Sequence, residues 1–326
     1  MTAPLTTRLA RADAGSAADA ARILGAGGLV AFPTETVYGL GADATDGRAV
    51  ARLYEAKGRP AFNPLIAHVP DITAARAIAQ FDADAARLAD FFWPGPLTLV
   101  LPRAPGCAVA ALATAGLDTI AVRVPDHPAA RAILAAFGKP VVAPSANRSG
   151  HVSPTHAAHV AADLGGRIDL IIDGGATSVG IESTIVACLG EPMLLRPGGL
   201  PRAAIERRLG RKMSAPSASA GDKPLAPGML GSHYAPRTPL RLNAGHVELG
   251  EALLAFGSTP PEGAAGAKTM LNLSERGNLV EAAANLFSHL RALDAVGAGA
   301  IAVMTIPSDG LGEAINDRLS RAAVTR

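Results

Sequence analysis

The chain has 326 residues and a formal net charge of +2, and 49% of its residues are hydrophobic against 18% charged. This composition excludes an intrinsically disordered chain, and no uninterrupted apolar run approaches the ~18 residues that cross a bilayer. The nearly balanced charge gives no sign of a general nucleic-acid surface, so any anion binding must be local. The length predicts one large domain and a smaller one, because single domains typically have roughly 100–200 residues.

The N-terminus and the cysteines are both consistent with a cytoplasmic protein. The opening segment MTAPLTTRLARADAG lacks the apolar core of a secretion signal. Cys107 and Cys188 are far apart and each has apolar neighbours. We therefore expect two buried structural thiols without a redox or metal role.

Short apolar runs alternate with alanine-rich stretches from about Gly27 to Pro201. The runs are rich in β-branched residues and end at Gly or Pro, which predicts strands at 28–32, 64–69, 97–102, 119–125, 140–145, 170–175 and 183–189. Helices, several of them beginning at a Ser, Asp or Thr cap, are predicted at 16–27, 47–58, 71–80, 82–92, 127–138 and 155–166. Because strands and helices do not alternate strictly, the pattern predicts an α/β domain with a twisted, mixed or largely antiparallel sheet and flanking helices.

The amino-acid composition changes after this region. Residues 210–239 are dense in Ser, Ala, Pro and Gly without periodicity, which predicts a linker. A second α/β pattern follows, with strands at 269–274 and 300–307 and helices at 279–293 and 310–323. We therefore expect a catalytic domain at 1–209, the linker at 210–239 and a smaller C-terminal domain at 240–326.

Standard nucleotide and metal signatures are absent. The sequence contains no G-x-x-x-x-G-K-[ST] and no G-x-G-x-x-G after a strand. His156 and His159 are three residues apart but lack a third ligand at useful spacing, so we interpret them as surface or capping residues. What remains is a set of polar segments at strand ends.

The first such segment is FPTETVYGLGADAT, residues 32–45. It places Thr34, Glu35, Thr36, Tyr38 and Asp43 just beyond a strand that ends at Pro33. Within this segment we expect Tyr38, Gly39 and Gly41 to shape a turn that presents Thr36.

The next two segments carry basic residues. In KGRPAFNPLIAH, Gly58 separates Lys57 from Arg59, and an unusual backbone there would let both cations neutralise one polyanion. The alternative is a pair of solvated cations that close a helix. In DTIAVRVP, Thr119 and Arg123 project from the same strand face, and an arginine inside an apolar strand needs an anionic partner or a solvent-filled cleft.

Two more segments complete the set. VVAPSANRSGHVSP carries Ser145, Asn147, Ser149 and Ser153, whose short polar side chains suit a phosphate or ribose contact but also a plain turn. IESTIVACLGEPMLLRPG carries Ser183 and Thr184 at a strand start and Arg196 at a strand end.

The four cations on separate elements indicate a site for a polyanion. Lys57, Arg59, Arg123 and Arg196 could surround a triphosphate with its Mg²⁺ and stabilise charge on the transferring phosphorus. No acid–base dyad, Ser-His-Asp set or activated cysteine accompanies them, which favours catalysis by positioning and electrostatics.

Together these segments resemble one family. PTETVYGLG, KGRP with NPL, PGPLT, RVPDHP, PSANRSG and ESTIV, followed by a linker containing HYAP, are similar to the motifs of the YrdC/Sua5 threonylcarbamoyl-AMP synthases. The motifs extend from about Gly28 to Gly198, and the linker and tail resemble the two-domain Sua5 type. The resemblance implies a YrdC-like catalytic domain and a Rossmann-like C-terminal domain.

The resemblance also implies an activity. A nucleotidyltransferase of this family converts L-threonine, bicarbonate or CO₂, and ATP with Mg²⁺ into L-threonylcarbamoyl-AMP and pyrophosphate, without an organic cofactor or a metal held by side chains. The product passes to a tRNA threonylcarbamoyl transferase complex for the t⁶A modification at position 37 of tRNAs that read ANN codons. Direct contact with tRNA is not indicated by the charge.

Residue roles follow from the same resemblance. The KxR and SxN signatures, taken as catalytic, fall on Lys57, Arg59, Ser145 and Asn147. Residues implied to hold threonine are Thr36, His68, Arg123, the backbone at Ala143, and Ser183. Residues implied to hold ATP are Arg59, Asn63, Thr119, Ser145, Ser153, Arg196 and Tyr234. We also expect the linker to cover the active site as a lid that brings Tyr234 near ATP.

Two other functions stay open at this point. A related carbamoyl-adenylate-forming enzyme, like the YrdC-like part of hydrogenase-maturation carbamoyltransferases, is disfavoured by the absence of zinc-finger cysteines and further domains. A double-stranded RNA or nucleotide-binding module is disfavoured by the near-neutral charge and by the 4% of aromatic residues.

Overall fold

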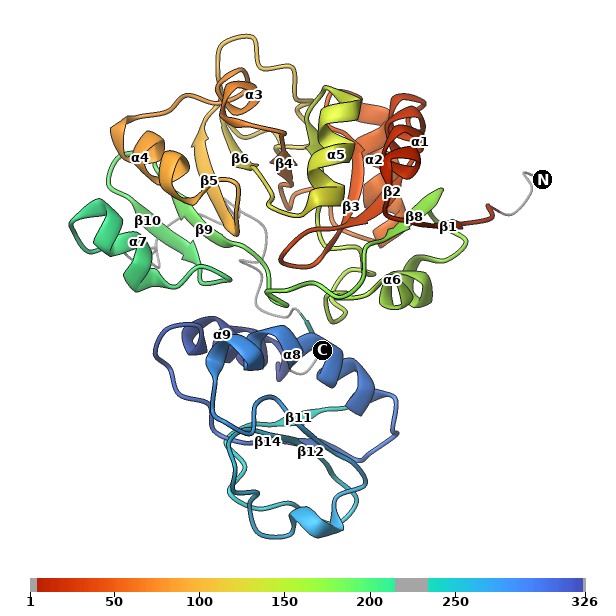
Figure 1. The fold of residues 1–326 in the computed structure, drawn as a ribbon, viewed down its shortest axis with the longest axis vertical. Helices are drawn as coiled ribbons and strands as arrows, with labels where there is room; N and C mark the ends of the chain where they lie inside the picture. Colours follow the sequence, from red (N-terminus) through yellow and green to blue (C-terminus); the bar gives the residue numbers. More distant parts are fainter. Residues whose placement is uncertain (1–4, 215–233, 325–326) are drawn as a thin grey trace.

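The computed structural model describes residues 5–214 and 234–324, and these form a large and a small α/β unit, each around one sheet (Figure 1). Most of the segment expected to act as a lid, residues 215–233, lies outside the described residues. Among the described helices, none is long and apolar enough to cross a membrane.

The large sheet has the strand order β1-β8-β2-β3-β7-β4-β6-β5-β9-β10. Its strands are β1 (Arg8–Arg11), β2 (Val30–Pro33), β3 (Tyr38–Asp43), β4 (Ile66–His68), β5 (Leu97–Pro102), β6 (Thr119–Arg123), β7 (Val141–Val142), β8 (Leu170–Asp173), β9 (Thr184–Ala187) and β10 (Met193–Arg196). The β1–β8, β2–β8, β4–β6 and β5–β9 pairs are parallel and the other neighbours antiparallel, so the predicted mixed sheet is confirmed.

Helices flank this sheet and match the six predicted ones. They are α1 (Ala14–Gly25), α2 (Gly47–Lys57), α3 (Ile72–Arg76), α4 (Ala83–Phe92), α5 (Pro128–Phe137) and α6 (Ala157–Leu164), followed by α7 (Arg202–Leu209). Capping residues explain where these helices begin and end, as α2 illustrates. Asp46 accepts a hydrogen bond from the Arg48 N–H at the start of α2, and α2 ends at Gly58 in the left-handed conformation (φ 61°).

One prediction about the segment 32–45 is wrong. Tyr38, Gly39 and Gly41 do not shape a turn, because they belong to β3, which pairs with β2. The turn is made by residues 34–37 instead. Close packing requires a glycine at position 41, since a Cβ there would lie 2.7 Å from the Phe32 ring. A Cβ on Gly39 would also be tight, at 3.1 Å from the Ala143 Cβ.

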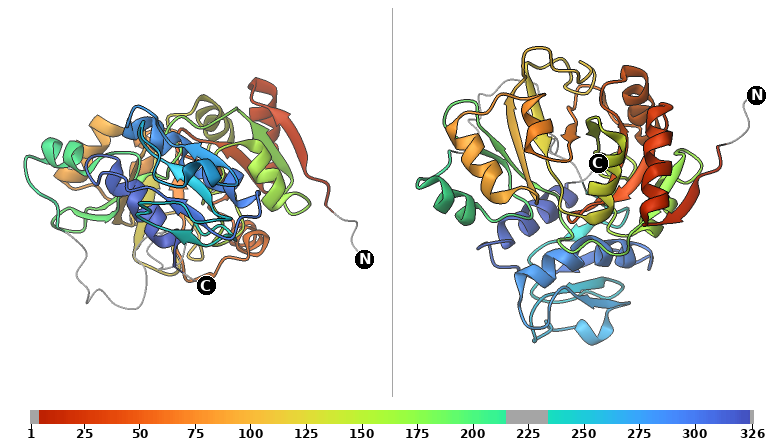
Figure 2. Two further views of the ribbon diagram at one scale, coloured as in Figure 1. Left: turned by 90° about the horizontal axis from the view of Figure 1, so that it is seen from below. Right: turned by 45° about the horizontal axis from the view of Figure 1, so that its top comes forward.

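The small sheet is entirely parallel among its described strands, with the order β11-β14-β12-β13. Its strands are β11 (Leu240–Arg241), β12 (Ala252–Ala255), β13 (Met270–Asn272) and β14 (Ile301–Val303), with a 3₁₀ turn η1 (Ala264–Gly266) and helices α8 (Leu279–Asp294) and α9 (Gly312–Ala322). The parallel sheet with its helices agrees with the expected Rossmann-like unit. Helices α8 and α9 lie between the two sheets (Figures 1 and 2).

The two units share a hydrophobic cluster. Val37, Val152 and Ile181 of the large unit are buried in the same cluster as the apolar faces of α8 and α9. The apolar face of α8 therefore packs partly against the large unit. Of the cysteines, Cys188 is buried and Cys107 is half-buried, and both are free thiols.

Candidate active site

The turn between β2 and β3 positions two side chains at the site. The Thr34 hydroxyl donates to the Val37 carbonyl (2.7 Å) and lies 2.8 Å from the Thr36 hydroxyl, which braces the turn. Glu35 does not line the pocket but holds other parts of the protein. Its carboxylate accepts hydrogen bonds from Arg123 (2.6 Å) and from the Asp126 N–H (3.0 Å). The turn therefore presents Thr36 and anchors Arg123.

The end of α2 supplies Lys57 and Arg59. Gly58 between them is left-handed, which is the unusual backbone that the sequence indicated, and both cations line one pocket. The Lys57 ammonium donates to the carbonyls of Ser145 and Asn147, and the Lys57 carbonyl accepts from the Ser149 N–H (2.9 Å). Lys57 thus ties α2 to the loop that follows β7.

The ends of β4 and β6 place His68 beside Arg123, because the two residues are partners in the parallel register. The His68 ring donates from Nδ1 to the Ile66 carbonyl (3.2 Å). Burial, helped by the neighbouring Arg123 charge, lowers the pKa of His68 to about 3. The imidazole is therefore neutral at physiological pH, with Nε2 as an acceptor.

The loop after β7 is held by its own hydrogen bonds. The Asn147 amide donates to the carbonyls of Arg148 (2.9 Å) and His151 (2.8 Å). Its Oδ1 is buried without a hydrogen-bond partner among the described residues, and the same is true of Arg59 Nε. Buried polar atoms are nearly always paired, so both atoms are suited to contact a bound ligand.

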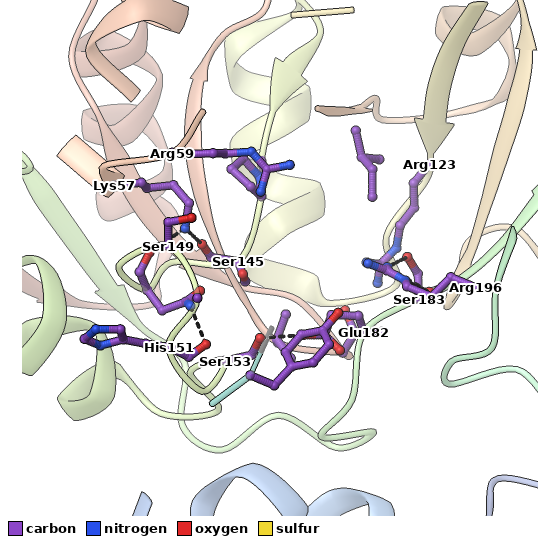
Figure 3. A pocket seen from close by; sticks show the side chains of 18 of the residues that line it. Lys57, Arg59, Arg123, Ser145, Ser149, His151, Ser153, Glu182, Ser183 and Arg196 are labelled. Atoms are coloured by element: carbon purple, nitrogen blue, oxygen red, sulfur yellow. Dashed lines mark hydrogen bonds between the residues drawn. The ribbon is translucent and has the colours of Figure 1, made fainter. Parts of the chain in front are cut away.

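The opposite wall comes from the segment before β9 and the end of β10. The Ser183 hydroxyl lies 2.7 Å from the Thr98 hydroxyl, and the Arg196 guanidinium donates to the Ser183 carbonyl (2.9 Å). Figure 3 shows Lys57 and Arg59 on one side of the pocket and Arg123 and Arg196 on the other.

Comparison with known proteins assigns the chain to a family. A family model described as "Telomere recombination", which covers the Sua5, YciO and YrdC proteins, matches residues 22–198, and a model described as "Threonylcarbamoyl-AMP synthase, C-terminal domain" matches residues 200–324. The chain belongs to the Sua5/YrdC family. It has both parts of the two-domain Sua5 type, as the sequence indicated.

Known relatives support this assignment, because they match the chain over nearly its whole length. It is 43% identical to a threonylcarbamoyl-AMP synthase of Bacillus subtilis, covering 94% of this chain and 92% of the relative. It is 42% identical to the synthase of Pyrococcus abyssi, covering 93% of each. The crystal structure of P. abyssi Sua5 complexed with L-threonine superimposes with a TM-score of 0.88 at 39% identity, covering 98% and 97% of the two chains.

The Sua5 fold brings most of the expected site residues into one pocket. Those that line it are Thr36, Lys57, Arg59, His68, Arg123, Ala143, Ser145, Asn147, Ser153, Ser183, Arg196 and Tyr234. Asn63 and Thr119 do not line it. Asn63 is buried, and its carbonyl accepts from the Tyr54 hydroxyl (3.0 Å) and from Arg59 (3.4 Å), whereas Thr119 lies half-buried at the start of β6.

Sequence reasoning missed other lining residues. They are Val37, Ile66, Pro144, Gly150, His151 and Glu182, whereas Ser149 was already among the polar candidates and also lines the pocket. Gly150 and His151 lie within the same quoted segment, so their contiguity with Ser149 was a usable signal. Glu182 begins the quoted ESTIV motif, beside Ser183, but an acidic residue gave no physical reason to expect it among cations.

Burial shapes the electrostatics of this pocket. Burial, together with the Arg59 charge, lowers the pKa of Lys57 well below its ordinary value, and burial lowers that of Arg59 to about 10. The Arg59 guanidinium therefore stays protonated at neutral pH and can pair with a bound polyanion. Within the described ranges, no cluster of three or more His, Cys, Asp or Glu side chains could hold a metal ion.

Proposed function

We propose that this Sua5 chain forms L-threonylcarbamoyl-AMP and pyrophosphate from L-threonine, bicarbonate or CO₂, and ATP. The observation that carries the proposal is the convergence of four cations from three separate segments in one pocket of a chain with both Sua5 parts. These cations are Lys57, Arg59, Arg123 and Arg196. A triphosphate and an amino-acid carboxylate together need such a set of cations.

The threonine subsite is proposed at the β4 and β6 ends. Arg123 is anchored on Glu35 and can pair with the substrate carboxylate, while neutral His68 offers an acceptor without a competing charge. Thr36, the backbone at Ala143, and Ser183 complete this side of the pocket.

The ATP subsite is proposed at the α2 end and the facing wall. Arg59, Ser145, Ser153, Arg196 and Tyr234 line that region. Asn63 is proposed to act by placing Arg59, whose guanidinium its carbonyl holds. Thr119 does not line the pocket, so we propose no direct ATP contact for it. Mg²⁺ is proposed to enter with the ATP phosphates, without an organic cofactor.

The reaction requires mainly that the protein align its substrates. Threonine's amine loses a proton and adds to CO₂, giving a carbamate. A carbamate oxygen then forms a bond to the α-phosphorus, and the bond between the α-phosphorus and its bridging oxygen breaks to release pyrophosphate. Lys57 holds the loop of Ser145 and Asn147 in place, so the polar groups are set before the substrate arrives. Arg59 and Arg196 stabilise the charge on the leaving group.

The burial of the cations argues against the RNA-binding alternative. Lys57 is 3% exposed, and Arg123 and Arg196 are each 4% exposed. A nucleic-acid backbone needs basic side chains at the surface, so these three suit a small anion that enters the pocket. No observation favours the hydrogenase-maturation reaction. We propose that the labile product passes to a tRNA threonylcarbamoyl transferase in the cytoplasm.

A pyrophosphate-release assay tests this function. Purified protein with ATP, Mg²⁺ and bicarbonate should release pyrophosphate only when L-threonine is added, and the adenylate product should appear in equal amount. Release that is independent of threonine, or no release at all, would contradict the synthase activity.

A further inference from the structure

The pocket receives a contribution from the C-terminal unit through Arg318 on α9. This arginine is 0% exposed and is the largest fully buried side chain of the described residues. Its Nε donates to Glu182 Oε2 (2.8 Å), and a terminal nitrogen donates to the Pro197 carbonyl (2.9 Å). Both acceptors belong to the large unit, so the guanidinium crosses the interface.

Glu182 connects this arginine to the pocket. Its side chain is buried and lines the pocket, and its other carboxylate oxygen accepts from the Ser153 hydroxyl. Figure 3 shows Glu182 and Ser153 together at the wall that faces the C-terminal helices. One carboxylate is therefore shared between a lining hydroxyl and the buried arginine of the other unit.

A carboxylate in this place needs a permanent cation. Burial alone would raise the pKa of Glu182, but the charges of Arg318 and Arg196 outweigh burial and lower it, so the group is ionised. Left without Arg318, a buried negative charge would repel the phosphates of a nucleotide or draw on the basic groups that bind them.

Arg318 also contacts a second lining residue. Its guanidinium lies over the Tyr234 ring, 5.1 Å from the centroid, and the ring stacks on Phe287 of α8 at 5.6 Å. Tyr234 adopts a left-handed backbone (φ 63°), which a non-glycine residue keeps only where its surroundings hold it. Arg318 and Phe287 are such surroundings.

We propose that Arg318 is a positioning residue for the ATP side of the pocket, acting through Glu182 and Tyr234, so that the C-terminal unit completes the nucleotide site. The inference rests on the proposed function in one respect, namely that the polyanion is ATP. Helix α9 would then help to form the nucleotide site, although the other cations of that site belong to the large unit.

The chain provides a matched control. Arg202 and Glu313 form another ion pair across the interface, but their side chains are 35% and 32% exposed and neither lines the pocket. Loss of that pair removes an interdomain contact without changing the charge at the pocket wall.

The test compares Arg318→Met, Glu182→Gln, the double variant, Arg318→Lys and the control Arg202→Met. Calorimetry measures binding of a non-hydrolysable ATP analogue, initial rates give the KM for ATP and for threonine, and thermal unfolding reports stability. Arg318→Met should weaken analogue binding and raise the KM for ATP by about tenfold or more, with the KM for threonine changed less than about twofold. Adding Glu182→Gln should restore most of this loss.

The remaining variants separate positioning from folding. Arg202→Met should bind the analogue like the wild type, and Arg318→Lys, which keeps the charge, should bind it better than Arg318→Met. If Arg318→Met does not fold, Arg318→Lys and the double variant carry the test. Both should then bind the analogue nearly as well as the wild type, and loss of binding in both overturns the proposal. Unchanged binding in Arg318→Met, or equal losses in Arg318→Met and Arg202→Met without restoration by Glu182→Gln, overturns the proposal.

A failure of the proposed function gives a different result. Wild-type protein that binds the analogue but releases no pyrophosphate with threonine contradicts the synthase activity, while the binding series still decides on Arg318. Wild-type protein that does not bind the analogue overturns both.

Discussion

At the scale of single residues, the cations of the pocket are held in place before any ligand binds. Lys57 and Arg196 donate to backbone carbonyls, and Arg123 is paired with Glu35. Donors fixed in this way need little reorganisation when charge develops on a substrate. The residues that hold the cations are consequently as important for the site as the cations themselves.

Arg123 provides a test of this arrangement. Its guanidinium donates to Glu35 and to the Gly95 carbonyl (3.3 Å), a fork that lysine does not reproduce. Arg123→Lys should raise the KM for threonine about tenfold or more, with the KM for ATP within about twofold of wild type. Initial-rate measurements check this, with exposed Arg131→Lys as control. An unchanged KM for threonine would place the carboxylate elsewhere.

His68 predicts an acid-dependent loss of stability. Its pKa is about 3 in the folded protein against 6.5 ordinarily, so below pH 6.5 the unfolded chain binds a proton that the folded protein does not. The contribution of neutral His68 to the free energy of unfolding is fully present above pH 6.5 and is lost progressively as the pH drops toward 3. Between pH 7 and 5 the free energy of unfolding should fall by about 2 kcal/mol more in the wild type than in His68→Gln.

Urea unfolding at both pH values measures that difference. Exposed His246→Gln serves as the control, because it should keep the wild-type pH dependence. Equal pH dependence in His68→Gln and the wild type would show that His68 is not a buried neutral group.

At the scale of elements, close backbone approaches decide how segments meet. The loop before β9 rests on α8 at Gly180, where a Cβ would lie 2.4 Å from the Ala284 Cα, and Gly180 also has a φ of +76°. The approach places the neighbouring Glu182 against α9. A single glycine thus sets the distance between the pocket wall and the C-terminal helices.

Gly180→Ala should therefore destabilise the protein in two ways. Backbone strain and overpacking together should lower the free energy of unfolding by about 2–5 kcal/mol. The matched control is Gly116→Ala, which has the same φ of +76° but open space around it, and should cost only about 1–2 kcal/mol from strain. Denaturant titrations compare the two, and equal losses would mean that the interface at Gly180 adapts.

At the scale of the whole molecule, the two units share a core. Val37, Val152 and Ile181 are buried against α8 and α9. Arg291 of α8 donates to the Val152 carbonyl and pairs with Asp163 (2.7 Å), and Arg318 pairs with Glu182. Apolar burial combined with buried charge pairs couples the stabilities of the units.

The shared core predicts cooperative unfolding. The chain has one tryptophan, Trp93, which lies in the large unit, whereas far-ultraviolet circular dichroism reports on both units. Urea curves followed by tryptophan fluorescence and by circular dichroism should coincide, as in a two-state transition. A separate earlier phase in circular dichroism alone would indicate that the C-terminal unit unfolds independently.

The family and the predicted helices and the mixed sheet were readable from sequence because they depend on local patterns and contiguous motifs. Gly58 is an example, since a glycine between two cations at a helix end implies a left-handed cap whatever the rest of the chain does. The same locality misled at Tyr38 to Gly41. Their glycines resembled those of a turn, and the packing of Phe32 against Gly41 and of Ala143 against Gly39 is visible only in the sheet.

The sequence by itself determined which polar groups the protein has and roughly which strand ends carry them, because side-chain type and short-range periodicity are local properties. Only the tertiary structure decided which of these groups meet. It paired Arg123 with Glu35, left Asn63 and Thr119 outside the pocket lining, and brought Arg318 to Glu182 across 136 positions of chain. Contacts at such separation follow from how the two units pack, and no local pattern encodes them.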